Sequence, residues 1–324
     1  MTLAFAAFTR RGEALARRLA EQFGGSVTRI DKENPLPVWT AQQFSEKEGL
    51  VFVGAVGIAV RAVAPHLRHK ATDPAVVAVD EGGRFAIPLV SGHLGGANAL
   101  AQAIAACLGA IPVITTATDG RGLFAVDSWA NAQGCLVKEP ERIKWVSSKV
   151  LDGKQILLRC PWPISGEKPD EVSLTEEETC DAAVTLYQEE NTALHLLPKA
   201  LTLGVGCRKG TSQAALENAY AALLAEQNFA PGAFVQAASI DEPGLLAFCT
   251  AHGWKLKTYA AEELSELPGD FTPSPFVAQI TGVDNVCERA AVRASGGHLI
   301  QKKWKGTGVT FAVALAPVHF DWRW

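Results

Sequence analysis

Short apolar runs alternate with segments of helical periodicity along most of the chain. Residues 3–8, 50–53 and 87–90 are apolar runs of the length expected for buried strands. After such runs, apolar residues recur every three or four positions, as in residues 97–108, which is typical of helices that cover a sheet. This alternation predicts the α/β fold class, with sheets whose strands are mainly parallel.

The alternation is strong in both end regions of the chain and weak between them. Residues 135–199 hold a few short strand-like runs, an acidic stretch and a Cys-Pro-Trp-Pro turn. We therefore predict two three-layer α/β domains with mainly parallel sheets, joined by a small middle segment. The predicted parts are an N-terminal α/β domain (1–134), the middle connecting segment (135–199), a C-terminal α/β domain (200–317) and a tail (318–324).

Residues 86–119 form the clearest strand–helix–strand unit of the chain. The strand at 87–90 leads into a glycine-rich turn at 91–96, and the helix that follows ends at Gly109. A second strand is predicted at 111–114. Such a unit favours a parallel pair of strands with a right-handed crossover, so both strands end at the same edge of the sheet.

Polar residues follow both strands of this unit. Because ligands of open α/β sheets bind beyond the carboxyl ends of the strands, we expect these residues to meet in one crevice. The first N–H groups of the helix point to the same place and favour an anion, and the glycines let a ligand approach the backbone. The residues predicted for this crevice are Ser91, Gly92, His93, Gly95, Gly96, Thr115, Thr116 and Asp119.

Cationic side chains near other glycine turns are candidates for binding an anionic ligand, since Arg and Lys suit carboxylates. The basic loop at residues 66–70 is either a solvated surface or a carboxylate-binding rim. The other candidates are Gly54, Gly57, Arg61, Arg121, Gly206, Arg208 and Lys209. Each of these cations is equally compatible with ordinary surface charge, and each glycine with a simple turn.

Composition and charge exclude several classes of function. The chain has 324 residues and a net charge of −4, so it lacks the positive excess typical of nucleic-acid binding. Its seven cysteines contain no Cys-x-x-Cys pair, which indicates reduced thiols and argues against a zinc or iron–sulfur site. The apolar stretches are shorter than the roughly 18 residues of a membrane span. At the N-terminus the arginines follow the apolar run, so we reject a signal peptide and expect a cytoplasmic protein.

Several segments resemble one known family. Three of them resemble the N-terminal part of the cobalt-precorrin-5A hydrolase family, CbiG, of anaerobic cobalamin biosynthesis: VFVGAVGIAVRAVAP (51–65), IPLVSGHLGGANALA (87–101) and PVITTATD (112–119). A further segment resembles the C-terminal domain of that family, which also occurs as the separate protein CobE: LGVGCRKGTS (203–212). The occurrence of both halves in this order indicates the family far more specifically than either motif alone.

The resemblance implies an enzyme and a substrate. The family acts on a cobalt-bearing, ring-contracted tetrapyrrole with a δ-lactone between the ring A acetate and the extruded meso carbon. Water opens the lactone, acetaldehyde leaves, and cobalt-precorrin-5B remains. Because the cobalt belongs to the substrate, the resemblance implies no cofactor and no metal site of the protein itself. The tetrapyrrole is the expected partner, while a homodimer and transient contacts with other corrin pathway enzymes are left open.

For this reaction, His93 is our leading general base, and Asp119 either orients it or is itself the base. Ser91 lacks the Gly-x-Ser-x-Gly setting of a nucleophile, so we expect it to donate a hydrogen bond to the substrate. The cations near the glycine turns are expected to bind the carboxylates of the tetrapyrrole. The donors expected for the developing oxyanion are the backbone N–H groups of Gly95, Gly96 and Ala97.

Two other functions stay open on the sequence alone. A non-catalytic carrier that hands the tetrapyrrole between pathway enzymes would need the same binding residues. A dinucleotide-binding oxidoreductase is disfavoured, because neither SGHLGG nor GVGCRKG has the Gly-x-Gly-x-x-Gly spacing with an acidic residue about 20 positions on. We further expect the substrate to lie between the two α/β domains, since binding sites favour domain interfaces.

Overall fold

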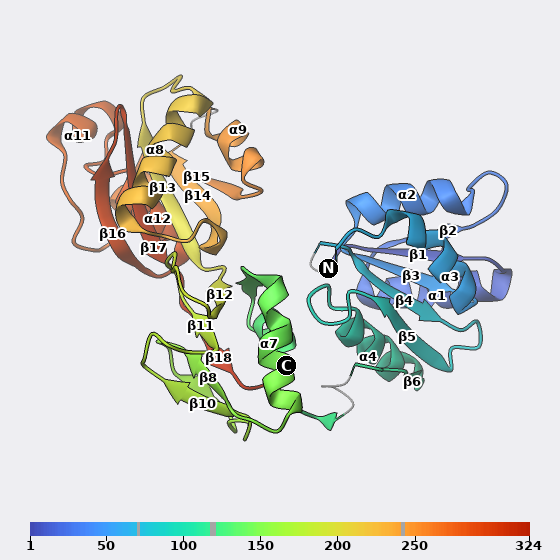
Figure 1. Cartoon of the computed structure of the whole chain (residues 1–324). Coiled ribbons are helices and arrows are strands. Elements are labelled where there is room, and N and C mark those ends of the chain that lie inside the picture. The colour runs from blue at the N-terminus through green and yellow to red at the C-terminus, as the bar shows by residue number, and fades with distance from the viewer. Residues whose placement is uncertain (70–71, 117–120, 241–243) are drawn as a thin grey trace. The chain divides into compact units, whose positions relative to one another are not determined.

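The computed structural model describes residues 1–69, 72–116, 121–240 and 244–324 (Figure 1). The chain forms two compact units, each with its own sheets. Unit 1 comprises residues 1–131, 147–154 and 324, and unit 2 comprises residues 132–146 and 155–323. Within the described ranges, no helix is long and apolar enough to cross a membrane.

Unit 1 is built on a six-stranded sheet with the strand order β2-β1-β3-β4-β5-β6. The first four strands are parallel, β5 is antiparallel to β4, and β6 is parallel to β5. The mainly parallel α/β sheet of the prediction is thereby confirmed, as is the parallel pair of the central strand–helix–strand unit. The strands are β1 (Leu3–Ala7), β2 (Ser26–Arg29), β3 (Gly49–Val53), β4 (Ala75–Val79), β5 (Phe85–Val90) and β6 (Ile111–Pro112).

Helices cover both faces of this sheet and complete three layers. On one face, Phe5 packs in a core with Leu19 of α1 and Ile104 of α4. On the other face, Phe52 packs in a core that includes residues of α2 and Val63 of α3. The helices of unit 1 are α1 (Arg10–Phe23), α2 (Leu36–Glu46), α3 (Val56–Val63), η1 (Ala64–His66), α4 (Ala97–Leu108), α6 (Val126–Ala132) and the second half of α7 (Ile143–Leu151), whose residues 143–146 belong to unit 2.

A tight turn reverses the chain between β4 and β5. The Asp80 carboxylate accepts hydrogen bonds from three backbone N–H groups, those of Gly82, Arg84 and Phe85. Burial alone raises the pKa of this carboxyl, but the three backbone donors and the side chain of Arg84 outweigh it and hold the pKa below its ordinary value. After the turn, Val90 pairs with Val76. The carboxyl end of β5 therefore lies at the edge where β1, β3 and β4 begin.

Unit 2 contains two five-stranded sheets. The middle segment, predicted to hold a few strands, forms the sheet β10-β8-β11-β12-β7, and the C-terminal region forms the sheet β15-β14-β13-β17-β16. The strands of the first are β7 (Cys135–Val137), β8 (Ile156–Arg159), β10 (Val172–Thr175), β11 (Ala182–Val184) and β12 (Leu194–Pro198). Those of the second are β13 (Leu201–Cys207), β14 (Phe234–Ile240), β15 (Lys255–Tyr259), β16 (His298–Lys305) and β17 (Val309–Leu315).

The C-terminal tail, to which the sequence assigned no role, belongs to unit 2 apart from its last residue. Its strand β18 (Phe320–Asp321) pairs with β9 (Ile164–Ser165). Phe320 and Trp322 are buried, so the tail is part of the packed structure. The helices of unit 2 are η2 (Pro140–Arg142), α8 (Gln213–Gln227), η3 (Pro231–Ala233), α9 (Gly244–Ala251), α10 (Ala261–Ser265), α11 (Pro275–Thr281) and α12 (Cys287–Ser295).

Gly204 of β13 lies directly against α12. A Cβ atom there would lie 1.8 Å from the carbonyl oxygen of Cys287 and 2.8 Å from the Cβ of Ala291. We expect Gly204→Ala to lower the free energy of unfolding by about 2 kcal/mol or more, because α12 has to move off the sheet. Urea denaturation measures this loss. Gly57→Ala is the control, since a Cβ at Gly57 meets nothing within 4 Å. Equal stability of Gly204→Ala and the natural chain would contradict the expected clash.

Candidate active site

The turn of residues 91–96 after β5 is packed closely on itself. Gly96 has a φ of 81°, and Ser91 has a φ of 57°, which non-glycine residues rarely adopt. A Cβ atom at Gly95 would lie 2.3 Å from the Cβ of Ser91, and one at Gly92 would lie 2.8 Å from Oδ1 of Asn98. The glycines were expected to admit a ligand, but the close packing of the turn already requires them.

Two of the three oxyanion donors predicted from the sequence are already used by this turn. The N–H of Gly96 donates to the carbonyl oxygen of His93 at 3.0 Å, and the N–H of Ala97 donates to that of Ser91 at 3.1 Å. The prediction was wrong for these two groups, because they close the turn onto the start of α4. The N–H of Gly95 makes no hydrogen bond within the described part of the chain, so it stays a predicted donor.

The side chain of His93 is hydrogen-bonded to the carboxylate of Asp127. Nδ1 of the ring lies 3.0 Å from Oδ2, and the two side chains are only 16% and 8% exposed. Asp127 is in the first turn of α6, and its Oδ1 accepts the N–H of Ser128 at 3.1 Å. A carboxylate at Nδ1 keeps the ring proton on that nitrogen and makes Nε2 the basic one. The pair therefore has the arrangement of an oriented general base.

The sequence did not predict Asp127 as a site residue. The role of orienting His93 was assigned to Asp119, which lies outside the described residues, so that prediction stays untested. A signal for Asp127 was present in the apolar run FAVDSWA at residues 124–130, where it is the only acidic residue. A carboxylate in such a run needs a hydrogen-bonding or charged partner when it is buried.

Thr116, beyond β6, lies beside the turn that follows β5. The side-chain amide of Asn98, in the first turn of α4, donates to Oγ1 of Thr116 at 3.1 Å. Asn98 is buried and was not among the predicted site residues, whereas the predicted Thr115 is exposed. The Oγ of Ser91 is buried without a hydrogen-bond partner in the described ranges. Buried hydroxyls are normally hydrogen-bonded, and the role of this one as a donor to substrate stays a prediction.

Gly54 and Gly57 follow β3, whose carboxyl end lies at the opposite edge of the sheet from the turn that carries His93. The structure therefore separates these two glycines from His93. Gly54 also has a packing role, since a Cβ there would lie 2.7 Å from the ring of Phe8. From Gly57, α3 runs back along the sheet to the start of β4, and Arg61 is in its last turn. Arg61 thus lies toward the edge that carries His93.

Residues 66–69, the described part of the basic loop, reach the same edge. The N–H of Arg68 donates to both carboxylate oxygens of Asp73, at 3.2 and 3.0 Å. The carbonyl oxygen of Asp73 lies 3.3 Å from the position that a Cβ of Gly95 would take. The side chain of Arg68 is exposed. The loop thus adjoins the turn that carries His93, and its role as a carboxylate-binding rim stays a prediction.

The remaining predicted cations are exposed in their turns. Nη1 of Arg121 donates to the last carbonyl oxygen of α7 at 3.3 Å, so this side chain has a partner in unit 1. Arg208 and Lys209 lie in the turn between β13 and α8 of unit 2. Gly206 is required by packing, because a Cβ there would lie 2.5 Å from Oγ1 of Thr310. Substrate binding by these four residues stays a prediction.

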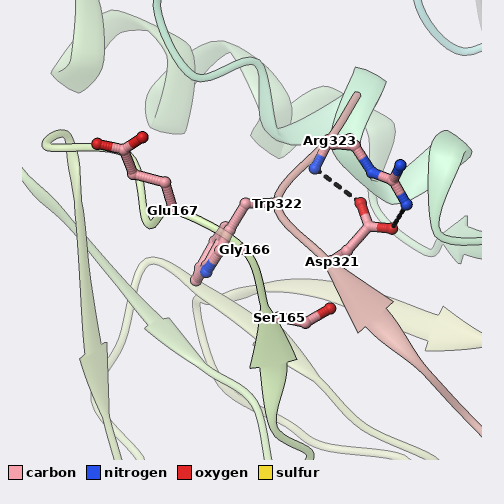
Figure 2. Close-up of a pocket in the computed structure, with 6 residues that line it drawn as sticks. All are labelled: Ser165, Gly166, Glu167, Asp321, Trp322 and Arg323. Atoms are coloured by element: carbon pink, nitrogen blue, oxygen red, sulfur yellow. Dashed lines mark hydrogen bonds and ion pairs between the residues drawn. The ribbon is translucent and has the colours of Figure 1, made fainter.

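A hollow at the pair β9 and β18 contains none of the predicted residues (Figure 2). The residues that line it are Ser165, Gly166, Glu167, Asp321, Trp322 and Arg323. The side chain of Arg323 donates to the carboxylate of Asp321 at 2.6 Å and its backbone N–H donates at 2.8 Å, which lowers the pKa of Asp321 to about 2. The carboxylate is ionised and paired at neutral pH, so we assign it no proton transfer.

In the described part of the chain, no three His, Cys, Asp or Glu side chains are grouped so that they could hold a metal ion. Burial raises the pKa of the Cys135 thiol to about 12, and those of Cys249 and Cys287 to about 11. These three thiols stay protonated at neutral pH, and a protonated thiol is a poor nucleophile and a poor metal ligand.

Both α/β regions match models of one protein family. Residues 38–119 match the model described as cobalamin synthesis G N-terminal, and residues 201–314 match the model described as cobalamin synthesis G C-terminus. Among solved structures, the crystal structure of CobE, a protein from the cobalamin biosynthetic pathway, is 27% identical and covers 36% of this chain and 91% of its own, with a TM-score of 0.33.

Curated relatives match almost the whole chain. A protein of Priestia megaterium named cobalt-precorrin-5A hydrolase is 31% identical, and the alignment covers 97% of this chain and 95% of the relative. A protein of the same name from Salmonella typhimurium is 33% identical, with 97% and 98% covered. As the resemblance of its segments predicted, the chain belongs to the cobalt-precorrin-5A hydrolase family, CbiG.

Proposed function

We propose that the chain opens the δ-lactone of cobalt-precorrin-5A with water and releases acetaldehyde to give cobalt-precorrin-5B. Two relatives of that name, aligned over nearly their full length, support the substrate. The observation that carries the chemistry is the hydrogen bond between His93 and Asp127, 3.0 Å long. In this proposal the cobalt enters as part of the substrate, and the reaction needs no cofactor.

The first step is attack of water on the lactone carbonyl. Nε2 of His93 takes a proton from the water while its oxygen bonds to the carbonyl carbon, and Asp127 stabilises the imidazolium that forms. Negative charge then develops on the carbonyl oxygen. The N–H of Gly95 and the hydroxyl of Ser91 are the donors proposed for that oxygen.

The second step releases the two-carbon fragment. Collapse of the tetrahedral intermediate breaks the bond to the ring oxygen of the lactone, and the ring A acetate becomes free. The departing oxygen takes the proton from His93 and becomes a hydroxyl on the extruded carbon. Removal of that proton by the neutral imidazole forms the carbonyl of acetaldehyde. The bond between the extruded carbon and the macrocycle breaks, and its electrons stay with the macrocycle. The imidazolium of His93 then releases its proton to solvent, which restores the neutral base.

Trapping the aldehyde tests this proposal. Purified protein is incubated with cobalt-precorrin-5A without oxygen, and acetaldehyde is captured as a hydrazone and quantified. We expect the amounts of acetaldehyde and cobalt-precorrin-5B to be equal. No aldehyde above a protein-free control would contradict the proposal. Tight binding of the substrate without release would instead indicate the carrier.

A further inference from the structure

The stretch from β3 to the basic loop has an unusual charge distribution. Residues 49–72 contain no Asp or Glu, although the net charge of the chain is −4. The same stretch contains Arg61, Arg68 and Lys70, together with two histidines. A polyanion that approaches α3 therefore meets cations of this stretch and none of its own carboxylates.

The outer side of α3 and its following loop is apolar as well as cationic. Ala59 and Val63 are buried in the core beneath the helix. By contrast, Val56 is 37% exposed, and Val60 and Leu67 are each 46% exposed. Exposed apolar residues that gather on one element mark a surface for a ligand more often than those scattered singly.

Gly57 leaves bare backbone on this outer side. A Cβ atom there would meet nothing within 4 Å, and its φ is not in the left-handed region. Neither packing nor backbone conformation requires glycine, which weakens a helix relative to alanine. Arg61 lies one helical turn further on the same side, since residues four apart are neighbours on a helix. The combination offers a flat ligand a close approach beside a guanidinium.

We propose that this surface docks the macrocycle of the tetrapyrrole. We name it the α3 face, and its residues are Val56, Gly57, Val60, Arg61, Leu67 and Arg68. The inference rests on the proposed function, which supplies a flat apolar ring that carries many carboxylates. The apolar side chains and the bare backbone contact the ring, while the two guanidinium groups pair with its carboxylates.

The α3 face ends beside the candidate base. The backbone N–H of Arg68 is hydrogen-bonded to Asp73, and the carbonyl oxygen of Asp73 lies 3.3 Å from the Cβ position of Gly95, two residues after His93. A macrocycle held by Arg68 therefore has one rim next to the turn that carries His93. The face thus binds the ring while the turn acts on one side of it.

Reversing both charges tests the cationic part of the face. In the double variant Arg61→Glu, Arg68→Glu, we expect KM to rise about tenfold or more, while kcat changes less than about twofold. The matched control is Arg11→Glu, Arg18→Glu, which makes the same change of charge at exposed positions of α1, on the other face of the sheet. Equal KM values in the two double variants would overturn the inference.

Substitution at Gly57 tests the bare backbone independently of charge. In a His93→Ala background, in which turnover is expected to be about 10³-fold slower, Gly57→Leu is expected to raise the Kd for cobalt-precorrin-5A about tenfold without lowering Tm. An unchanged Kd would overturn docking on the α3 face and leave the proposed function intact. If the natural chain released no acetaldehyde but Gly57→Leu still weakened binding, the proposed function would fail and the α3 face would stand.

Discussion

His93→Ala is expected to lower kcat for acetaldehyde release by about 10³-fold, with little change in KM. The ring of His93, fixed by Asp127 at 3.0 Å, is the proposed base for both the attacking water and the later hydroxyl. Without it, neither proton has an oriented acceptor, whereas the surfaces that bind the macrocycle are unchanged. Acetaldehyde trapped at saturating substrate measures kcat.

Chemical rescue makes this prediction specific to the imidazole. Added imidazole is expected to restore part of the rate of His93→Ala, since it supplies a base where the ring was removed. His298→Ala is the matched control, because this histidine is exposed at the start of β16 in unit 2, and it is expected to keep the natural rate. If His93→Ala had the same kcat as the natural chain, the base would be another residue, and Asp119 would be the first candidate.

The elements defined by local signals were predictable from the sequence. The helix at residues 97–108 has the predicted bounds, because apolar periodicity defines its length and a glycine ends it. Gly109 is in the left-handed conformation with a φ of 67°, and its N–H is bonded to the carbonyl oxygen of Ala105. Both signals lie within one stretch of chain, so they need no knowledge of the rest of the fold.

The edge at which each turn lies depends on pairing between distant strands. Residues 80–83, Asp-Glu-Gly-Gly, have the composition of a turn, and the chain reverses there after β4. The edge at which the turn after β5 lies can be assigned only when the position of β5 in the six-stranded sheet is known. Because β5 is antiparallel to β4, the turn that carries His93 lies at the edge where the parallel strands begin. This separates it from Gly54 and Gly57, although all three positions follow strands.

Hydrogen-bond partners were the least predictable part of the site. His93 and Asp127 are 34 positions apart, and nothing in the sequence between them specifies the contact. The sequence marks Asp127 only as a carboxylate in an apolar run, without naming its partner. Similarly, the glycine-rich sequence around Gly96 and Ala97 is typical of an anion site, yet the backbone N–H groups of both residues are hydrogen-bonded within the folded turn. Composition indicates which groups are available, whereas the folded backbone determines which of them are already bonded.

Asp127→Asn is expected to lower kcat by about 10²-fold or more, again with little change in KM. The carboxylate accepts from Nδ1 of His93 and so directs the basic lone pair to Nε2. An amide in its place is free to donate to Nδ1, which moves the ring proton to Nε2 and removes the base. It also carries no charge to stabilise the imidazolium. The measurement is the rate of acetaldehyde release in single-turnover and steady-state assays.

The control for Asp127→Asn is Asp80→Asn, which removes a carboxylate of the same unit at the opposite edge of the sheet. Since Asp80 holds only the β4–β5 turn, its variant is expected to lose stability without losing kcat once folded. Because asparagine has nearly the shape of aspartate, a folded Asp127→Asn that loses kcat alone assigns Asp127 a positioning role. Partial recovery in Asp127→Glu would support that role, whereas a natural kcat in Asp127→Asn would show that His93 needs no oriented tautomer.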